Sequence, residues 1–210
     1  MIDLEENLFL NIATIMARSR ANGPGVRAVI WVQGCTIGCP GCYNNFTHEH
    51  AAKKLRSPKK IAEWINSIDE IEGITFSGGE PFEQASAISS VIELVNSKRD
   101  KPLSVFIFTG FNFDNLKNDK SPVVQRLISL TDMLSAGPYV ASLNKDDLLW
   151  RGSSNQELVY LTDRYSKTDE EKWLKDSPVE ELLLTDRGIM RTGFRAKKGD
   201  LYKSILQTSY

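Results

Sequence analysis

The stretch "VRAVIWVQGCTIGCPGC", residues 26–42, runs from an apolar segment directly into a loop that holds every cysteine of the chain. Its first half is rich in β-branched and apolar residues, which predicts a buried strand. Its second half contains Cys35, Cys39 and Cys42 in the spacing C-x3-C-x2-C, and there is no fourth cysteine. The stretch therefore indicates a sheet with a thiol-rich loop at the carboxyl end of one strand.

The same alternation of strand, loop and helix continues on both sides of this stretch. Amphipathic segments predict helices, and two of them begin with a Ser-Pro pair, at Ser57 and Ser121, which suits the first turn of a helix. Short apolar segments between them predict strands. The expected strands cover residues 8–17, 26–34, 73–79, 103–110, 132–137 and 157–163, and the expected helices cover residues 57–71, 83–99 and 121–130.

Repeated strand–loop–helix units predict an α/β fold with right-handed crossovers and a mostly parallel sheet. In such sheets the functional loops lie at the carboxyl ends of the strands. Those ends carry the cysteine loop and the segments "SGGEPF", "TGF" and "AGPY". We therefore expect these four segments to meet at one edge of the sheet.

The composition excludes several classes of protein. Hydrophobic residues make up 41% and charged residues 25% of the 210 residues, as in an ordinary globular protein. A net charge of −1 provides no basic surface for nucleic acid or for an anionic membrane. The first residues are acidic where a signal peptide is basic, and no apolar run is long enough for a membrane span, so we expect a cytoplasmic protein. Three clustered cysteines also argue against a disulfide framework.

The cysteine spacing by itself is compatible with two kinds of metal site. A structural zinc ion takes four protein ligands, and His48 is near enough in the sequence to complete a set with the three cysteines. A [4Fe–4S] cluster normally takes four cysteines, so three would leave one iron with an open position. In metal sites an open position generally marks catalysis. The residues alone leave both alternatives open.

Five motifs in a fixed order carry a resemblance to a known family. They are "NGPGVRAVIWVQGCTIGCPGCYN", "ITFSGGEPF", "FIFTGFNFDNL", "DMLSAGPY" and "LWRGSSNQELVYL". Together they resemble the anaerobic ribonucleotide reductase activating proteins, which are small enzymes of the radical S-adenosylmethionine superfamily. The resemblance extends from about Asn11 to Leu161.

This resemblance implies a fold and a reaction. The fold is a partial, open TIM-like barrel of five or six parallel strands with helices outside. The enzyme cleaves S-adenosylmethionine reductively at a [4Fe–4S] cluster and generates a glycyl radical on a large partner enzyme. It needs a low-potential electron donor and no catalytic acid or base, because the radical abstracts the hydrogen itself. The alternatives are a radical enzyme acting on another peptide or small molecule, and a zinc-binding module without enzymatic activity.

The resemblance also assigns roles to individual residues. It implies that Cys35, Cys39 and Cys42 hold the cluster. Gly41 and Tyr43 flank the third cysteine at the adenine end of the nucleoside. Gly78, Gly79 and Glu80 receive the methionine amino group, where glycines let the backbone approach a ligand and the carboxylate accepts from an ammonium. The remaining candidates for cofactor binding are Thr109, Gly110, Ser153 and Asn155.

The end of the chain lies beyond this resemblance. We expect a radical S-adenosylmethionine core over residues 1–165 and an extension over residues 166–210. The segment "KTDEEKWLKDS" predicts a short charged helix, and "VEELLLTDRGIMRTGFR" predicts two strands joined at "DRG". The extension either packs on the core as a structural element or provides an edge on which a partner docks.

Overall fold

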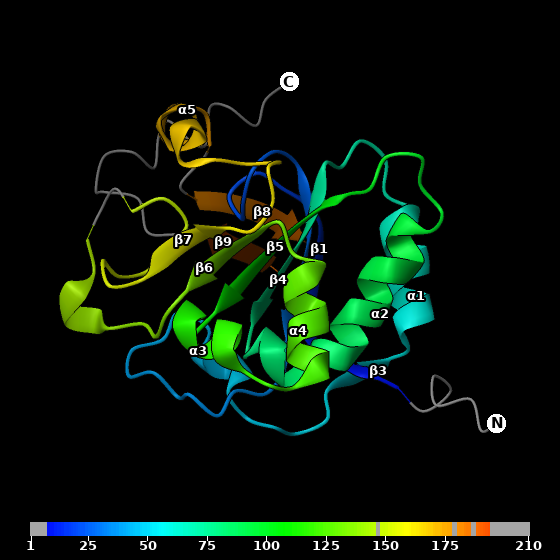
Figure 1. Cartoon of the computed structure of the whole chain (residues 1–210), viewed down its shortest axis with the longest axis horizontal. Coiled ribbons are helices and arrows are strands. Elements are labelled where there is room, and N and C mark those ends of the chain that lie inside the picture. The colour runs from blue at the N-terminus through cyan, green and yellow to red at the C-terminus, as the bar shows by residue number, and fades with distance from the viewer. Residues whose placement is uncertain (1–7, 146–147, 178–179, 186–187, 194–210) are drawn as a thin grey trace.

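The computed structural model of the chain describes residues 8–145, 148–177, 180–185 and 188–193 (Figure 1). Its strands are β1 (Leu10–Ser19), β2 (Arg27–Val32), β3 (Lys54–Arg56), β4 (Gly73–Gly78), β5 (Ser104–Thr109), β6 (Met133–Ala136), β7 (Glu157–Tyr160), β8 (Glu180–Thr185) and β9 (Gly188–Gly193). Its α-helices are α1 (Pro58–Asn66), α2 (Ala85–Asn96), α3 (Phe113–Asn118), α4 (Pro122–Ser129) and α5 (Glu170–Asp176). Short 3-10 turns cover Asn45–Thr47, Pro81–Gln84, Ala141–Leu143 and Lys167–Asp169.

Seven strands form one sheet in the order β3-β1-β2-β4-β5-β6-β7. Strands β2, β4, β5 and β6 run parallel to one another, whereas β1 and β3 on one side and β7 on the other pair antiparallel. Because β3 and β7 stand at the two edges, the described strands form an open sheet. The expected α/β fold is confirmed, but its parallel part has four strands and not the five or six expected.

The central strands are buried on both faces, and their side chains alternate between two cores. In β2, Ala28, Ile30 and Val32 belong to the main core, whereas Val29 and Trp31 belong to a second cluster on the other face. This alternation follows from the period of two residues in a strand. It explains why the strands appear in the sequence as nearly continuous apolar runs.

Helices α1, α2 and α4 lie side by side over one face of the sheet (Figure 1). Helix α1 begins where the Ser-Pro pair predicted, because the Ser57 hydroxyl accepts a hydrogen bond from the Lys60 amide at 3.4 Å and Pro58 follows it. The sequence did not predict α3 or β3, which are short elements of six and three residues. In the described parts of the chain, no helix combines the length and the apolar character that crossing a membrane requires.

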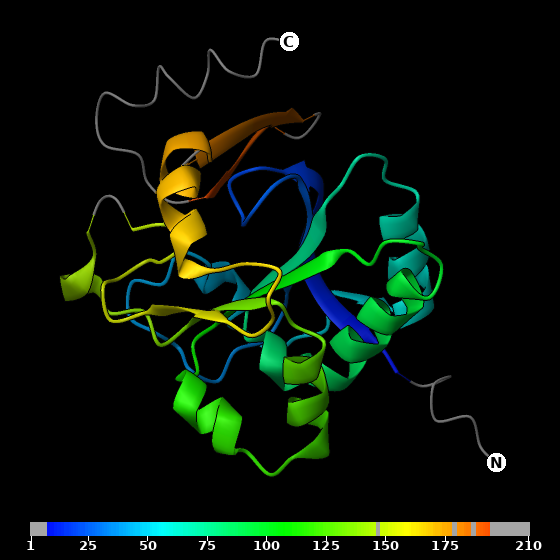
Figure 2. The same ribbon diagram turned by 45° about the horizontal axis from the view of Figure 1, so that its top comes forward.

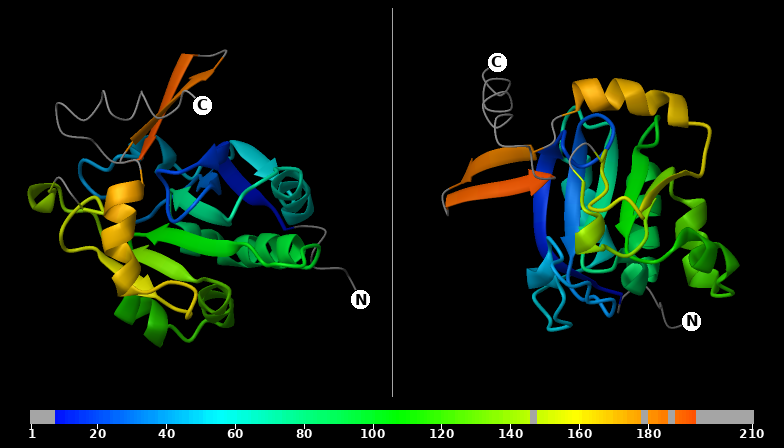
Figure 3. Two further views of the ribbon diagram at one scale, coloured as in Figure 1. Left: turned by 90° about the horizontal axis from the view of Figure 1, so that it is seen from above. Right: turned by 90° about the vertical axis from the view of Figure 1, so that its left-hand side faces the viewer.

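The extension packs partly on the opposite face of the sheet (Figure 2). Trp173 of α5 lies 5.1 Å from the Trp150 ring and 5.4 Å from the Tyr165 ring, measured between centroids. Strands β8 and β9 form the expected hairpin, which is a separate two-stranded sheet. Residues 186 and 187 of its turn lie outside the described residues. In Figure 3 the hairpin projects from the body of the molecule, with one end against the core.

The amino ends of the parallel strands are held together by one buried arginine. Arg27 is 0% exposed, and its guanidinium donates to Thr75 Oγ1 at 2.7 Å, to Ser104 Oγ at 2.8 Å and to three backbone carbonyls. These bonds link β2, β4 and β5. Gly73 leaves the space for this side chain, because a Cβ on Gly73 would lie 2.2 Å from Arg27 Nη1. Burial lowers the pKa of Arg27, although nearby Tyr165, Asp132 and Glu72 oppose the shift.

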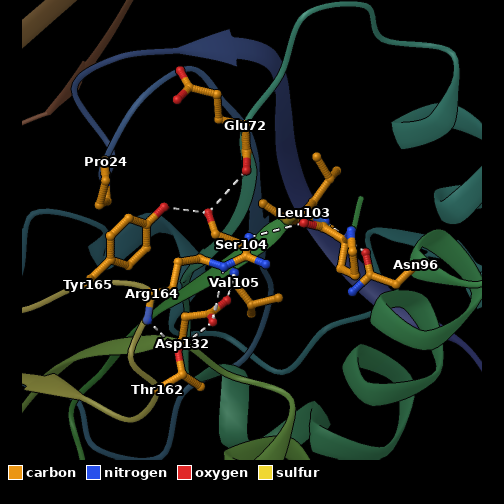
Figure 4. A network of polar contacts seen from close by, with 12 residues as sticks. Pro24, Glu72, Asn96, Leu103, Ser104, Val105, Asp132, Thr162, Arg164 and Tyr165 are labelled. Carbon is orange, nitrogen blue, oxygen red and sulfur yellow. Dashed lines mark hydrogen bonds and ion pairs between the residues drawn. The ribbon is translucent and has the colours of Figure 1, made fainter. Parts of the chain in front are cut away.

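Ser104 extends this network toward the surface (Figure 4). Its hydroxyl accepts from the Tyr165 hydroxyl at 2.8 Å and donates to the Glu72 carbonyl at 3.2 Å. Asp132 lies beside it, and its carboxylate accepts from the Val105 amide at 2.8 Å and from the Thr162 hydroxyl at 2.7 Å. The buried polar groups of Arg27, Ser104 and Asp132 at the amino end of the sheet therefore have hydrogen-bond partners within the protein. Arg27 has a structural role there, and its donors are all used within the protein.

Replacing this arginine should destabilise the fold strongly. In Arg27→Met the partners of the guanidinium remain buried without a donor, so we expect the free energy of unfolding to fall by about 3 kcal/mol or more. Urea unfolding measures the change. Arg56→Met, on the exposed strand β3, is the matched control and should change stability by less than about 0.5 kcal/mol. Equal effects of the two substitutions would contradict the structural role of Arg27.

Candidate functional site

A cavity of about 670 Å³ lies on the face of the sheet that the main helices do not cover. Its lining includes the three cysteines, residues 77–80 at the end of β4 and residues 108–110 at the end of β5. All four loops expected at the carboxyl ends of the strands therefore meet in one cavity. The loop after β6 contributes Gly137 and Tyr139.

The cysteine loop is fixed at its base by backbone hydrogen bonds. The Gly34 amide donates to the Thr47 carbonyl at 2.8 Å, and the Cys35 amide donates to the His48 carbonyl at 3.0 Å. Within the loop, the Cys42 amide donates to the Cys39 carbonyl at 3.2 Å. All three thiols are free and half-buried, and all three line the cavity.

Two of the three thiols have raised pKa values. Burial raises the pKa of Cys35 and of Cys42, and hydrogen bonds from backbone amides oppose the shift in both. Metal binding has to displace the protons of such thiols. In the parts of the chain that the structure describes, no group of three or more His, Cys, Asp and Glu side chains is gathered around the point that one metal ion would occupy.

Gly78 and Gly79 allow the end of β4 to pack directly on the start of the cysteine loop. A Cβ on Gly78 would lie 2.6 Å from the Val32 carbonyl oxygen, and one on Gly79 would lie 2.0 Å from the Gly34 carbonyl oxygen. Gly78 also has a φ of +100°, which favours glycine. The sequence suggested that these glycines make room for a ligand. The structure shows a second reason why glycine is needed at both positions: the end of β4 packs against the backbone of Val32 and Gly34.

Glu80 is the buried carboxylate of the site. It is 1% exposed, and it accepts from the Phe82 amide at 3.0 Å, the Thr109 hydroxyl at 2.9 Å and the Gly110 amide at 2.8 Å. Burial raises its pKa to about 7, although the three hydrogen bonds oppose the shift. The structure thus joins Glu80, Thr109 and Gly110, which the sequence had predicted separately, into one unit on the cavity wall.

Two tyrosines lie at the rim of the cavity beside the cysteine loop. The rings of Tyr43 and Tyr139 are 5.2 Å apart between centroids, and the Asn144 side chain donates to both hydroxyls. Gly41 is outside the cavity lining, and a Cβ on it would contact Tyr139 and Ala141 at 3.7 Å. The segment after β6 therefore covers the loop around the third cysteine.

Ser153 and Asn155 do not line the cavity. The Ser153 hydroxyl accepts from the Val140 amide at 3.1 Å, and the Asn155 amide group donates to the Pro138 carbonyl at 2.8 Å. Both side chains thus hold the segment after β6 in place. Their neighbours Gly152 and Gln156 line the cavity in their stead.

Several lining residues were not expected from the sequence. Trp31 and Phe108 belong to segments predicted only as apolar strands, yet both line the cavity. Thr14, Trp31 and Ser77 lie in one row across β1, β2 and β4, because Thr14 pairs with Trp31 and Trp31 pairs with Ser77. Alternation within each strand signals which residues share a face. It does not signal which of the two faces is left uncovered by helices.

The fold and the cysteine loop define an α/β protein with three thiols at the carboxyl end of a parallel strand, and comparison with known sequences identifies the loop as an iron–sulfur site. The model of the 4Fe-4S single cluster domain family matches residues 21–159, which is more than half of the chain. This match favours the cluster over zinc.

The chain is 32% identical over 146 residues to the anaerobic ribonucleoside-triphosphate reductase-activating protein of Escherichia coli K12, covering 67% of this chain and 92% of that protein. The activating protein of Enterobacteria phage T4 is 30% identical over 152 residues, covering 70% of this chain and 92% of its own. The chain belongs to this family of activating proteins. Among solved structures, QueE from Escherichia coli matches 50% of this chain and 55% of its own with 18% identity and a TM-score of 0.42, too distant for an argument.

The buried carboxylate predicts a pH-dependent stability. The folded pKa of Glu80 is about 7, above its ordinary value of 4.5. Between these values the folded chain holds a proton that the unfolded chain has lost, so this contribution to stability falls as the pH rises and levels off above pH 7. The loss should be of the order of 2–3 kcal/mol.

Urea unfolding of the metal-free chain between pH 5 and pH 8 tests this prediction. Glu80→Gln has no proton to lose, so its stability should fall less steeply across this range. Glu93→Gln, on the exposed surface of α2, should keep the slope of the unaltered chain. The same slope in Glu80→Gln and in the unaltered chain would show that another group causes the pH dependence.

Proposed function

We propose that this chain generates a glycyl radical on an anaerobic ribonucleotide reductase, using S-adenosylmethionine and one [4Fe–4S] cluster. The observation that carries the proposal is the single cavity shared by the three cysteines and the segment around Glu80. Family membership supports it, because the relatives are named as activating proteins of such reductases.

In this proposal Cys35, Cys39 and Cys42 hold the cluster. The donor set fits: three free, half-buried thiols on one loop face the same cavity. Four irons offer a separate iron to each cysteine, so the three sulfurs need not surround one point as they do around zinc. The fourth iron has no cysteine within this chain, which leaves a position for S-adenosylmethionine.

The cavity wall next to the cysteines then receives S-adenosylmethionine. We assign the ammonium of its methionine part to the region of Gly78, Gly79 and Glu80, where the ionised carboxylate attracts a positive charge. Thr109 and Gly110 position this carboxylate through their hydrogen bonds. Tyr43 lies at the rim, on the side assigned to the adenine, and Gly41 lies behind it, outside the cavity lining.

The remaining residues serve to shelter the reaction. When bound, the cluster and S-adenosylmethionine supply a radical that removes a hydrogen atom from the substrate. Trp31 and Phe108 are apolar walls of the cavity and keep water from it. No side chain of the chain is assigned as a general acid or base. The electron comes from a low-potential donor, and we propose the cytoplasm as the compartment because thiols stay reduced there.

The direct test is activation of a reductase. The chain is reconstituted anaerobically with iron and sulfide and mixed with S-adenosylmethionine, a low-potential reductant and the anaerobic ribonucleoside-triphosphate reductase of the same organism. Electron paramagnetic resonance should then detect a glycyl radical on the reductase. Cleavage of S-adenosylmethionine without any radical on the reductase would instead favour another peptide or a small molecule as the substrate.

The cysteine assignment makes a separate prediction. Replacing Cys35, Cys39 or Cys42 singly by Ala should lower S-adenosylmethionine cleavage by at least about a hundredfold, because an iron loses its only protein ligand. Chromatography of the cleavage products measures the loss, and circular dichroism should remain unchanged. Asn45→Ala lies in the same loop outside the cavity lining and is the control. Substantial cleavage by any of the three variants would refute the assignment.

A further inference from the structure

The cavity has a second end, which the extension forms. Arg191, Thr192 and Gly193 of β9 line the same cavity as the three cysteines. Asn22, in the connection between β1 and β2, lies at this end and accepts through its carbonyl from the Thr75 hydroxyl at 2.7 Å. In Figures 1 and 3 the hairpin β8–β9 lies against the β1 side of the sheet. The extension is therefore part of the cavity wall.

A buried polar network attaches the hairpin at this position. Glu181 accepts from the Ser19 hydroxyl at 2.5 Å and from the Arg20 amide at 2.8 Å. Thr192 faces Glu181 across the hairpin and accepts from the Asn22 side chain at 2.9 Å. Ser19 is 1% exposed and Thr192 is 8% exposed. Charged acceptors with buried donors make strong hydrogen bonds, so the hairpin base is fixed to the core.

The hairpin lies outside the residues that the family model matches. The family match ends at residue 159, and the similarity to the Escherichia coli protein uses 92% of that protein but 67% of this chain. The β9 residues at this end of the cavity therefore lie outside the residues that the family model matches.

The chemistry of this end suits a polypeptide. Thr14, Asn22 and Thr192 provide hydrogen-bonding side chains, and Arg191 adds a positive charge that is paired with Glu180. In the described part of the chain, β8 and β9 pair only with each other, so no described strand pairs with the outer edge of β9. The described hairpin residues that line the cavity, Arg191, Thr192 and Gly193, all belong to β9, so β9 is the hairpin strand that reaches the cavity. An unpaired strand edge binds an extended peptide by adding it as a further strand.

We propose that the glycine-bearing segment of the partner reductase enters the cavity at the hairpin end and pairs with the free edge of β9. This inference rests on the proposed function, in which the cofactors occupy the cysteine end. The target glycine then reaches the cofactors from the side that they leave open. Both roles considered for the extension apply, since α5 packs on the core and the hairpin receives the partner.

Two variants of the hairpin test the inference. The first ends after Ser177, which removes β8 and β9 but retains α5 and its contact between Trp173 and Trp150. The second is Glu180→Gln combined with Arg191→Met, which removes both members of the ion pair so that neither charge is left without its partner. Arg56→Met, on the opposite edge strand β3, is the matched control.

Three quantities are measured for each reconstituted protein. They are S-adenosylmethionine cleavage without the reductase, the Kd for the reductase, and the yield of glycyl radical by electron paramagnetic resonance. We expect cleavage within about twofold of the unaltered chain, and a Kd at least about tenfold weaker with a lower radical yield, because the shortened chain lacks the pairing edge and the double variant lacks the ion pair that ties β9 to β8. Arg56→Met should match the unaltered chain in all three.

The outcomes separate the inference from the proposed function. If the unaltered chain produces no glycyl radical, the proposed function fails, and the inference fails with it. If the unaltered chain produces the radical, and the double variant binds and activates the reductase equally well, the inference alone is overturned. If the shortened chain does not fold, the Kd and the radical yield of the double variant are sufficient to test the inference.

Discussion

The close contact between the end of β4 and the start of the cysteine loop is the constraint on which the site depends. Gly79 packs on the Gly34 carbonyl at a separation that no side chain would allow. The Glu80 amide then donates to the same carbonyl at 2.8 Å. One backbone contact thus fixes the base of the thiol loop and places the buried carboxylate beside it. A thiol loop without this support would have no defined position relative to Glu80.

The amino ends of the parallel strands have a structural role, whereas their carboxyl ends form the candidate binding site. At the amino end, Arg27 uses its donors within the protein and joins β2, β4 and β5. At the carboxyl end, the thiols and Glu80 keep part of their binding capacity for a ligand. This division has a physical reason: polar groups that are satisfied internally stabilise the sheet, and only groups left partly unsatisfied can bind something else. The division is the one expected for parallel α/β sheets, in which ligands bind at the carboxyl ends.

The extension adds residues of β9 to the wall of the cavity. In a sheet of this shape one face is covered by α1, α2 and α4, and the other face is left for the site. The hairpin, held by Glu181 and Thr192, forms part of the wall on that open face. The cavity therefore has a cysteine end within the residues that the family model matches and a hairpin end to which β9 contributes residues beyond that match.

The sequence by itself determined the order of the elements, the α/β class and the thiol loop after β2. These depend on local signals: strand and helix periodicity, Ser-Pro helix starts, and cysteine spacing. Only the tertiary structure decided that Glu80 bonds Thr109 and Gly110, that Ser153 and Asn155 support a neighbouring segment, and that Thr192 lies on the cavity wall. Such contacts join residues far apart in the chain. Their partners depend on which face of the sheet the helices leave uncovered, and no local pattern carries that information.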